Sequence, residues 1–388
     1  MDNIISRFPS LAERIFDSLD DENLVNSKTV SRSWSEFTEN EVFFLRRIIK
    51  KLSGGFEDFK EAWKLVMQKA DIEMIKELAL AVKFFLSKHP GNCYDENCNH
   101  RNVSHSPLHI GAEAGQVTLC EFILKISKDK NPRLENGDDI GWTSLHEAAQ
   151  QGHLLICYMI MNKITDKNPK DRDGYTPLHA AAAEGHLETF KMIMNKVADI
   201  NPKDNEGCTP LHAAAENSQK ELCKFIADKV EDKNPEDFNG YTPLHAAAAG
   251  GELEIFQVIA NKLTDINPAD NGGWTPLHAA AGNSQKEICK FIVDKVEEKN
   301  PEDGYTGYTP LHAAAANGEL EIFEMIANKV TNINPRNNNG LTPLHEAARN
   351  GHNGLCKFIA DKVEDKNPED DNGMTPRELM WYNISGMF

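Results

Sequence analysis

The tetrapeptide Thr-Pro-Leu-His recurs along most of this 388-residue chain and constrains its fold more than any other feature. It begins at Thr176, Thr209, Thr242, Thr275, Thr309 and Thr342, and variants of it begin at Ser106 and Thr143. Successive tetrad histidines lie 33 residues apart, except for one step of 37 and one of 34. Such a period is typical of repeat proteins, in which each copy buries its apolar face only by stacking on its neighbours.

The residues within one copy predict two antiparallel helices followed by a turn. Thr176 is a favourable N-cap and Pro177 suits the first helical position, so one helix begins at the tetrad. The alanines that follow allow this helix to approach its neighbours closely. Leu187, Phe190 and Ile193 recur at helical spacing and predict a second helix with one apolar face. An Asn-Pro pair then ends regular structure, and an Asp/Gly-rich turn leads to the next copy.

The tetrad and its period resemble those of ankyrin repeats. The resemblance covers residues 104–388 and implies an all-α solenoid of about eight full repeats with terminal caps. The 37-residue step predicts a four-residue insertion at 133–140, and the 34-residue step predicts one extra residue near 304–306. The central residue of the second helix alternates between large and small, which predicts even packing along the stack; the positions are Phe190, Cys223, Phe256, Cys289, Phe323 and Cys356.

Three segments follow from these patterns. Residues 105–388 are the expected repeat array, ending in a single capping helix at 377–382. Residues 53–104 are expected to form a helical linker and a degenerate capping repeat, because 71–76 resembles a second helix without a preceding tetrad. Residues 1–52 do not follow the repeat and predict three short helices.

The order of residues in this first segment resembles the F-box. The most specific part is the run Val-Ser-Arg-Ser-Trp at 30–34. The resemblance implies a three-helix bundle that binds the Skp adaptor of a cullin–RING ubiquitin ligase. The residues implied to contact the adaptor are Phe8, Pro9, Leu11, Ile15, Leu19, Leu24, Val30 and Trp34. The alternative is that these helices only cap the array.

The charge balance limits the partners. The formal net charge is −18, and such an acidic surface repels phosphate backbones and anionic membranes. We therefore expect no nucleic acid or membrane partner and favour a basic target protein. The N-terminus lacks the pattern of a signal peptide, so we expect a cytoplasmic protein, with the nucleus as a second compartment. The eight cysteines of such a protein are expected to be free thiols.

Catalytic and cofactor signals are weak. The tetrad histidines recur at one structural position, so we expect them to form hydrogen bonds between adjacent turns rather than to act in catalysis. The chain has no Gly-rich phosphate loop, and no cofactor is expected. Cys93, Cys98, His100 and His105 form the one candidate for a zinc site, although their spacing matches no familiar finger.

The position before each tetrad is often aromatic, and the ankyrin resemblance places it on a hairpin finger that faces a concave groove. Aromatic rings are costly in a solvated turn unless something covers them, and Trp and Tyr are enriched in binding hot spots. The alternative is that the rings cover one another along the array. The predicted groove residues are Trp142, Tyr175, Tyr241, Trp274 and Tyr308, with Phe238 and Tyr305 as extensions.

Two functions compete on these patterns. The first is a non-enzymatic substrate receptor of a cullin–RING ubiquitin ligase, with residues 8–44 on the adaptor and the groove on a target protein. The second is a scaffold or inhibitor that binds one protein, with residues 1–52 as a structural cap. A metal-dependent function at 93–105 is the third and weakest hypothesis.

Overall fold

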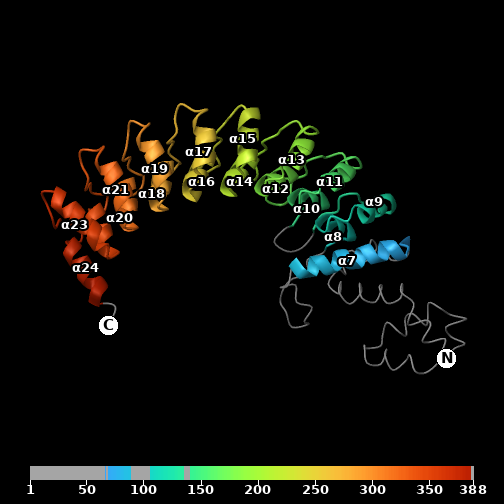
Figure 1. The fold of residues 1–388 in the computed structure, drawn as a ribbon, viewed down its shortest axis with the longest axis horizontal. Coiled ribbons are helices and arrows are strands. Elements are labelled where there is room, and N and C mark those ends of the chain that lie inside the picture. Colours follow the sequence, from blue (N-terminus) through green and yellow to red (C-terminus); the bar gives the residue numbers. More distant parts are fainter. Residues whose placement is uncertain (1–65, 67–68, 89–104, 135–139, 386–388) are drawn as a thin grey trace, which may run out of the picture. The chain divides into compact units, whose positions relative to one another are not determined.

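The computed structural model describes residues 66, 69–88, 105–134 and 140–385 (Figure 1). The F-box-like residues from Phe8 to Trp34 lie outside the described residues, and so do Cys93, Cys98 and His100, so the predictions made for them stay predictions.

The described residues form helices and no β-strand. The helices are α7 (Ile72–Lys88), α8 (Pro107–Glu113), α9 (Val117–Ile126), α10 (Ser144–Gln150), α11 (Leu154–Met161), α12 (Pro177–Ala183), α13 (Leu187–Met194), α14 (Pro210–Glu216), α15 (Lys220–Lys229), α16 (Pro243–Gly250), α17 (Leu253–Ala260), α18 (Pro276–Gly282), α19 (Lys286–Val293), α20 (Pro310–Ala316), α21 (Leu320–Ala327), α22 (Pro343–Arg349), α23 (Asn353–Lys362) and α24 (Pro376–Ser385). For the described residues, the prediction of repeated helix pairs without strands is confirmed. Within the described ranges, none of these helices has the length and hydrophobicity needed to cross a bilayer.

The structure comprises two compact units. Unit 1 contains the described residues up to Pro177 together with Glu188–Val197, and unit 2 contains Leu178–Leu187 together with the described residues from Ala198 onward. In unit 1, α8 pairs with α9 and α10 pairs with α11, and helix α7 packs against both α8 and α9.

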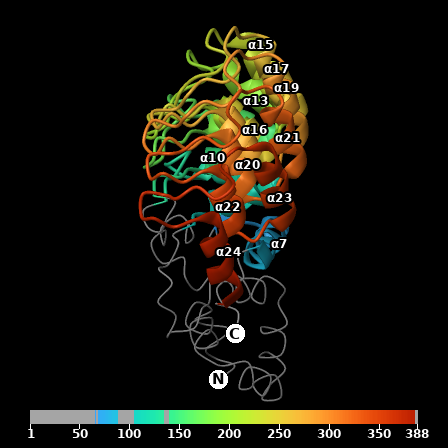
Figure 2. The same cartoon turned by 90° about the vertical axis from the view of Figure 1, so that its left-hand side faces the viewer.

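Unit 2 repeats one arrangement along its length. The inner helices α14, α16, α18, α20 and α22 pack in succession, and α24 packs on α22. The outer helices α15, α17, α19 and α21 pack in the same order. Figure 2 shows these outer helices along one side and the non-helical connections on the other. We call each turn that precedes an inner helix a finger; the fingers of unit 2 are 203–208, 236–241, 269–274, 302–308, 336–341 and 369–374.

Each inner helix begins with a capping box made by its own tetrad. At α18, the Thr275 backbone N–H donates to His278 Nδ1 over 3.1 Å, and Thr275 Oγ1 lies 2.9 Å from the same nitrogen. The asparagine of the preceding Asn-Pro pair supplies a second cap, because the Leu277 N–H donates to Asn267 Oδ1 over 2.8 Å. The sequence predicted the first cap from Thr-Pro, but it did not predict the second.

The core lies between inner and outer helices. The alternating central residues of the outer helices are buried, as expected for Phe256 and Cys289, each with 0% of its surface exposed. The structure adds a contact that the alternation did not predict. The Phe291 ring, two residues after the small Cys289, meets the Phe256 ring edge-on at a centroid distance of 5.8 Å. Phe358 and Phe323 repeat this contact at 6.2 Å.

Candidate functional site

Backbone hydrogen bonds give each finger a fixed shape. In the finger 236–241, Asp237 Oδ1 accepts the N–H groups of Asn239 over 2.7 Å and Tyr241 over 2.8 Å. Gly240 has φ of +78°, a left-handed conformation that favours glycine. Adjacent fingers are also joined, because the Phe238 N–H donates to Glu206 O over 2.9 Å. The side chains of the fingers therefore project from a rigid ladder.

The residue before the tetrad lies at the base of its finger, and at four of these positions its ring stacks on the tetrad histidine. The Trp274 ring is 4.7 Å from the His278 ring and 6.2 Å from the Tyr308 ring, centroid to centroid. Tyr241 and Tyr308 stack in the same way on His245 and His312 at 5.1 and 5.0 Å. We call Tyr241, Trp274 and Tyr308 the aromatic row of unit 2.

Unit 1 carries a shorter row of the same kind. The Trp142 ring lies 4.6 Å from the His146 ring and 6.0 Å from the Tyr175 ring. All five row residues are half-buried. Both sequence hypotheses are thus compatible with the geometry, since Trp142 stacks on Tyr175 and Trp274 on Tyr308, while all five side chains remain partly exposed. That the row binds a partner stays a prediction.

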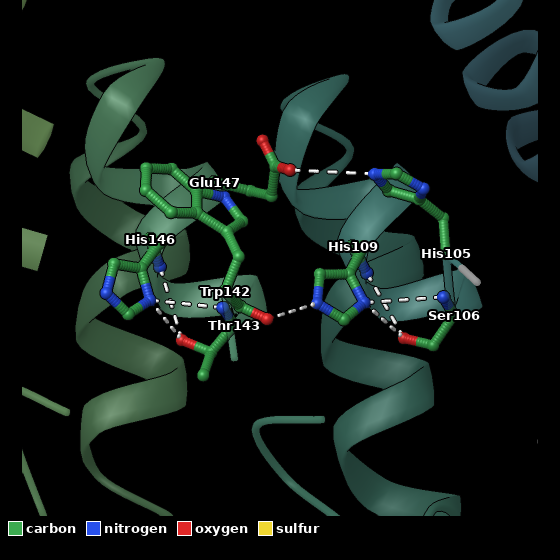
Figure 3. A network of polar contacts seen from close by, with 7 residues as sticks. All are labelled: His105, Ser106, His109, Trp142, Thr143, His146 and Glu147. Atoms are coloured by element: carbon green, nitrogen blue, oxygen red, sulfur yellow. Dashed lines mark hydrogen bonds and ion pairs between the residues drawn. The ribbon is translucent and has the colours of Figure 1, made fainter. Parts of the chain in front are cut away.

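The tetrad histidines connect consecutive repeats, as Figure 3 shows for His109 and the carbonyl of Trp142. His109 Nε2 lies 3.4 Å from Trp142 O, and His146 Nε2 lies 3.1 Å from Tyr175 O. Nδ1 of each ring accepts the N–H of its own N-cap residue, so Nε2 must carry the proton and donate to the carbonyl. The hydrogen bonds between adjacent turns that the sequence predicted are confirmed. They use Nε2, while Nδ1 bonds within its own tetrad.

Burial keeps these histidines neutral. Burial lowers the pKa of His278 and of His312 to about 4. The hydrogen bonds to the Tyr308 and Leu341 carbonyls raise the pKa, but they offset only part of this effect. The pKa of His109 is also well below its usual range, first because of burial and then because of the neighbouring His105. A neutral ring with both nitrogens engaged is unsuited to general acid–base chemistry.

Acidic side chains surround the first ring of the unit 2 row. Burial raises the pKa of Glu216, and the carboxylates of Asp204 and Asp237 raise it further. The pKa of Tyr241 rises to about 12, from burial first and then from Glu216 and Asp237. The pKa of Cys208, which occupies a row position without a ring, rises to about 12 for the same reasons. A thiol with this pKa is not a nucleophile at neutral pH.

Phe238 does not belong to the row. It lies at the tip of its finger with 65% of its surface exposed, and Tyr305 lies at another tip with 75% exposed. Tyr305 occupies the finger with the predicted extra residue. There, Asp303 Oδ1 accepts the N–H groups of Thr306 and Tyr308, three and five residues on, instead of two and four.

The candidate zinc site is described only at His105. Its side chain is buried, with Nε2 3.8 Å from Glu147 Oε1 and the ring edge-on to His109 at 5.7 Å (Figure 3). Within the described ranges, no three His, Cys, Asp or Glu side chains come together as a metal site would require. The three other proposed ligands lie outside these ranges, so the zinc hypothesis stays untested.

The sequence analysis missed one apolar surface, on the outer side of α11. Leu154, Leu155 and Tyr158 have 42%, 54% and 48% of their surfaces exposed. The signal was available in the alignment of copies, since the positions of Leu155 and Tyr158 carry Glu188 and Lys191 in the next repeat. The loss of both charges marks this helix as different from its neighbours.

Comparison with known proteins agrees with this geometry. A family model for ankyrin repeats (three copies) matches residues 66–171, 154–237, 229–303 and 296–370, whereas no F-box model matches. No curated protein matches the chain. Ankyrin repeats bind proteins, so the array serves protein–protein interaction. The capping boxes, the stacked helix pairs and the family match together show that the chain belongs to the ankyrin repeat family.

Proposed function

We propose that the array is a non-catalytic receptor for a protein partner, which binds along the aromatic row of unit 2. The observation that carries this proposal is the row itself, in which Tyr241, Trp274 and Tyr308 are half-buried on fixed finger bases. Rings held in one position lose little conformational freedom on binding, which is why Tyr and Trp often supply much of the affinity of an interface. The lowered pKa of His278 and His312 and the raised pKa of Cys208 support a non-enzymatic role, since none of these groups has the pKa of a catalytic group.

The test compares partner capture from cell extract by the full chain and by two variants. Trp274→Ala with Tyr308→Ala removes two rings of the row. Leu320→Ala removes an apolar side chain of α21 that is 37% exposed on the outer face, so it is the control. A specific partner should be retained by the control and lost by the row variant. Equal capture by all three proteins would mean that the row is not the binding surface.

The second proposal concerns delivery. The F-box-like pattern from Phe8 to Trp34 supports a role as substrate receptor of a cullin–RING ubiquitin ligase in the cytoplasm. The array would then hold the target near the ubiquitin-carrying enzyme and raise its effective concentration there. Purified Skp adaptor should bind the full chain and should not bind a variant with Ile15→Asp and Trp34→Ala. If the unaltered chain does not bind the adaptor, the delivery role is wrong and a scaffold or inhibitor remains.

Deletion of residues 1–52 separates the two readings of the N-terminus. An independent adaptor-binding domain should be removable without loss of array stability. A structural cap, in contrast, should leave the array less stable or aggregated when it is deleted. Chemical denaturation followed by circular dichroism reports this difference.

A further inference from the structure

Two fingertips of unit 2 present aromatic rings to solvent. Tyr305 and Phe238 are the most exposed large hydrophobic side chains in the part of the chain that the structure describes, at 75% and 65%. They lie two fingers apart, and the tip between them carries Asn271. An exposed ring on a mobile loop would need no explanation, so the question is whether the backbone under these two rings is fixed.

The backbone of Phe238 is held by hydrogen bonds at both its N–H and its carbonyl group. Its N–H donates to Glu206 O of the preceding finger over 2.9 Å. Its carbonyl accepts from Asn271 Nδ2 of the following finger over 3.0 Å. The ring lies against the preceding finger, where a Cβ added to Gly207 would be only 3.0 Å from Phe238 Cδ1.

Tyr305 is held in a related way. Its carbonyl accepts from Asn338 Nδ2 over 3.0 Å, and its ring lies over Gly272, where an added Cβ would come within 3.0 Å of Tyr305 Cε2. Gly272 does not have a positive φ, and the equivalent positions of other fingers hold Asn239 and Asn339. The backbone therefore does not require glycine at 272. A side chain at this position would instead press against the Tyr305 ring.

The ladder beneath these rings carries excess negative charge. The fingers 203–208, 236–241, 269–274 and 302–308 contain seven carboxylates and one lysine. In unit 2 as described, the lysine ion pairs join outer-helix segments instead, namely Lys220–Glu254, Lys262–Asp228 and Lys286–Glu321. The finger carboxylates form no ion pair among the described residues.

The fold of a finger does not require this charge. At the position of Asp237 and Asp270, the later finger 336–341 has Asn337. Asn337 Oδ1 accepts the same two N–H groups, from Asn339 over 2.9 Å and Leu341 over 3.0 Å. An amide thus fulfils the hydrogen-bonding role, and the aspartates add only their charge.

We propose that the fingertips of Phe238 and Tyr305 bind a basic, extended segment of a partner protein through two apolar side chains about six residues apart. Packed helices have axes 8–10 Å apart, so two repeats separate the rings by about 20 Å, which an extended chain spans in about six residues. Rigid rings supply the anchors, and the surrounding carboxylates select positive charge. This inference rests on the proposed receptor function and names the chemical class of the partner.

The test uses a phage-displayed library of random peptides of about 16 residues, a length that covers both anchors with margin, selected on the full chain. The enriched peptides should carry net positive charge and two apolar residues about six positions apart. A synthetic peptide of the enriched sequence should bind at least about tenfold more weakly to the Phe238→Ser, Tyr305→Ser variant. Circular dichroism confirms that the variant is folded.

Three further variants separate the contribution of charge from that of shape. Asp237→Asn with Asp270→Asn keeps the hydrogen bonds that Asn337 makes in its own finger, so it should weaken the peptide several-fold and reduce the dependence of its affinity on salt. Leu154→Ser with Leu155→Ser removes exposed apolar surface from α11 and should leave binding unchanged. Gly272→Ala displaces the Tyr305 ring and should weaken binding although it removes no contact group.

The outcomes separate this inference from the proposed function. If the library enriches neutral or acidic peptides, or none, or if binding survives loss of both tip rings, the inference is overturned. Should the peptide then be lost by Trp274→Ala with Tyr308→Ala, the row still binds a partner and only the fingertip assignment fails. Binding unaffected by tip and row variants alike would overturn both.

Discussion

The buried histidines make a quantitative prediction about stability and pH. His278 and His312 have a pKa of about 4 in the folded chain, whereas an unfolded histidine has a pKa of about 6.5. Between these two values, the unfolded state binds more protons than the folded state. Stability is therefore fully present above pH 6.5 and falls as the pH is lowered towards about 4.

The magnitude follows from the two pKa values. At pH 5, each of these histidines should cost the folded state about 2 kcal/mol relative to pH 8, and the two together should cost about 4 kcal/mol. The other tetrad histidines with a lowered pKa, such as His212 and His245, act in the same direction. The raised pKa values of Glu216 and Glu346 act in the opposite direction.

A double variant isolates the two histidines from these other groups. His278→Gln with His312→Gln retains a side chain that can accept and donate a hydrogen bond but cannot take up a proton. We expect it to be less stable than the unaltered chain at pH 8, yet to lose about 4 kcal/mol less on transfer to pH 5. Guanidinium denaturation followed by circular dichroism at constant ionic strength measures both. Equal losses in the two proteins would show that these histidines are not the groups that titrate.

Three further predictions concern the core, the caps and the thiols. Phe256→Ala should lower the free energy of unfolding by about 3–5 kcal/mol, because it leaves a cavity where a fully buried ring was. The exposed Phe238→Ala should lower it by less than about 0.5 kcal/mol. Similar losses in chemical denaturation would contradict the core assignment. Thr275→Val should cost about 1–2 kcal/mol by removing the N-cap of α18, and Thr275→Ser should restore most of it. Burial raises the pKa of Cys223 and Cys289 to about 12. Iodoacetamide at pH 8 should therefore label these thiols far more slowly in the folded chain than in guanidinium, which mass spectrometry measures. Rapid labelling of the folded chain would refute this prediction.

Much of the fold could be predicted because the same local sequence pattern recurs in every copy of the repeat. Thr-Pro sets the start of each inner helix, and the apolar spacing of the outer helices sets the buried face. Both the Phe–Cys alternation and the extra residue near Tyr305 are visible as departures from a fixed period. These features depend on neighbours in sequence or on the copy 33 residues away, so comparing the copies within this one sequence is enough to reveal them.

The site was predicted less completely, because exposure depends on what adjacent copies place around a residue. Sequence alone grouped Phe238 with the aromatic row, but the structure places it at a fingertip and the row at the finger bases. The sequence analysis also made no prediction for Lys233 and Lys299, whose ammonium groups donate to the carbonyls of Val230 and Val296 in the segments that follow α15 and α19. Leu155 and Tyr158 lie at positions that face outward in every copy, so their exposure follows from the stack and not from their hydrophobicity.

The sequence by itself determined the repeat unit, its two helices, the N-cap at the tetrad and the excess of negative charge, because these are local or periodic properties of the chain. Only the tertiary structure decided which rings stack on histidines and which reach solvent, and that the carboxylates of the fingers 203–208, 236–241, 269–274 and 302–308 form no ion pair among the described residues. Those outcomes depend on the register between neighbouring copies, where a displacement of a few ångströms buries one ring and exposes the next.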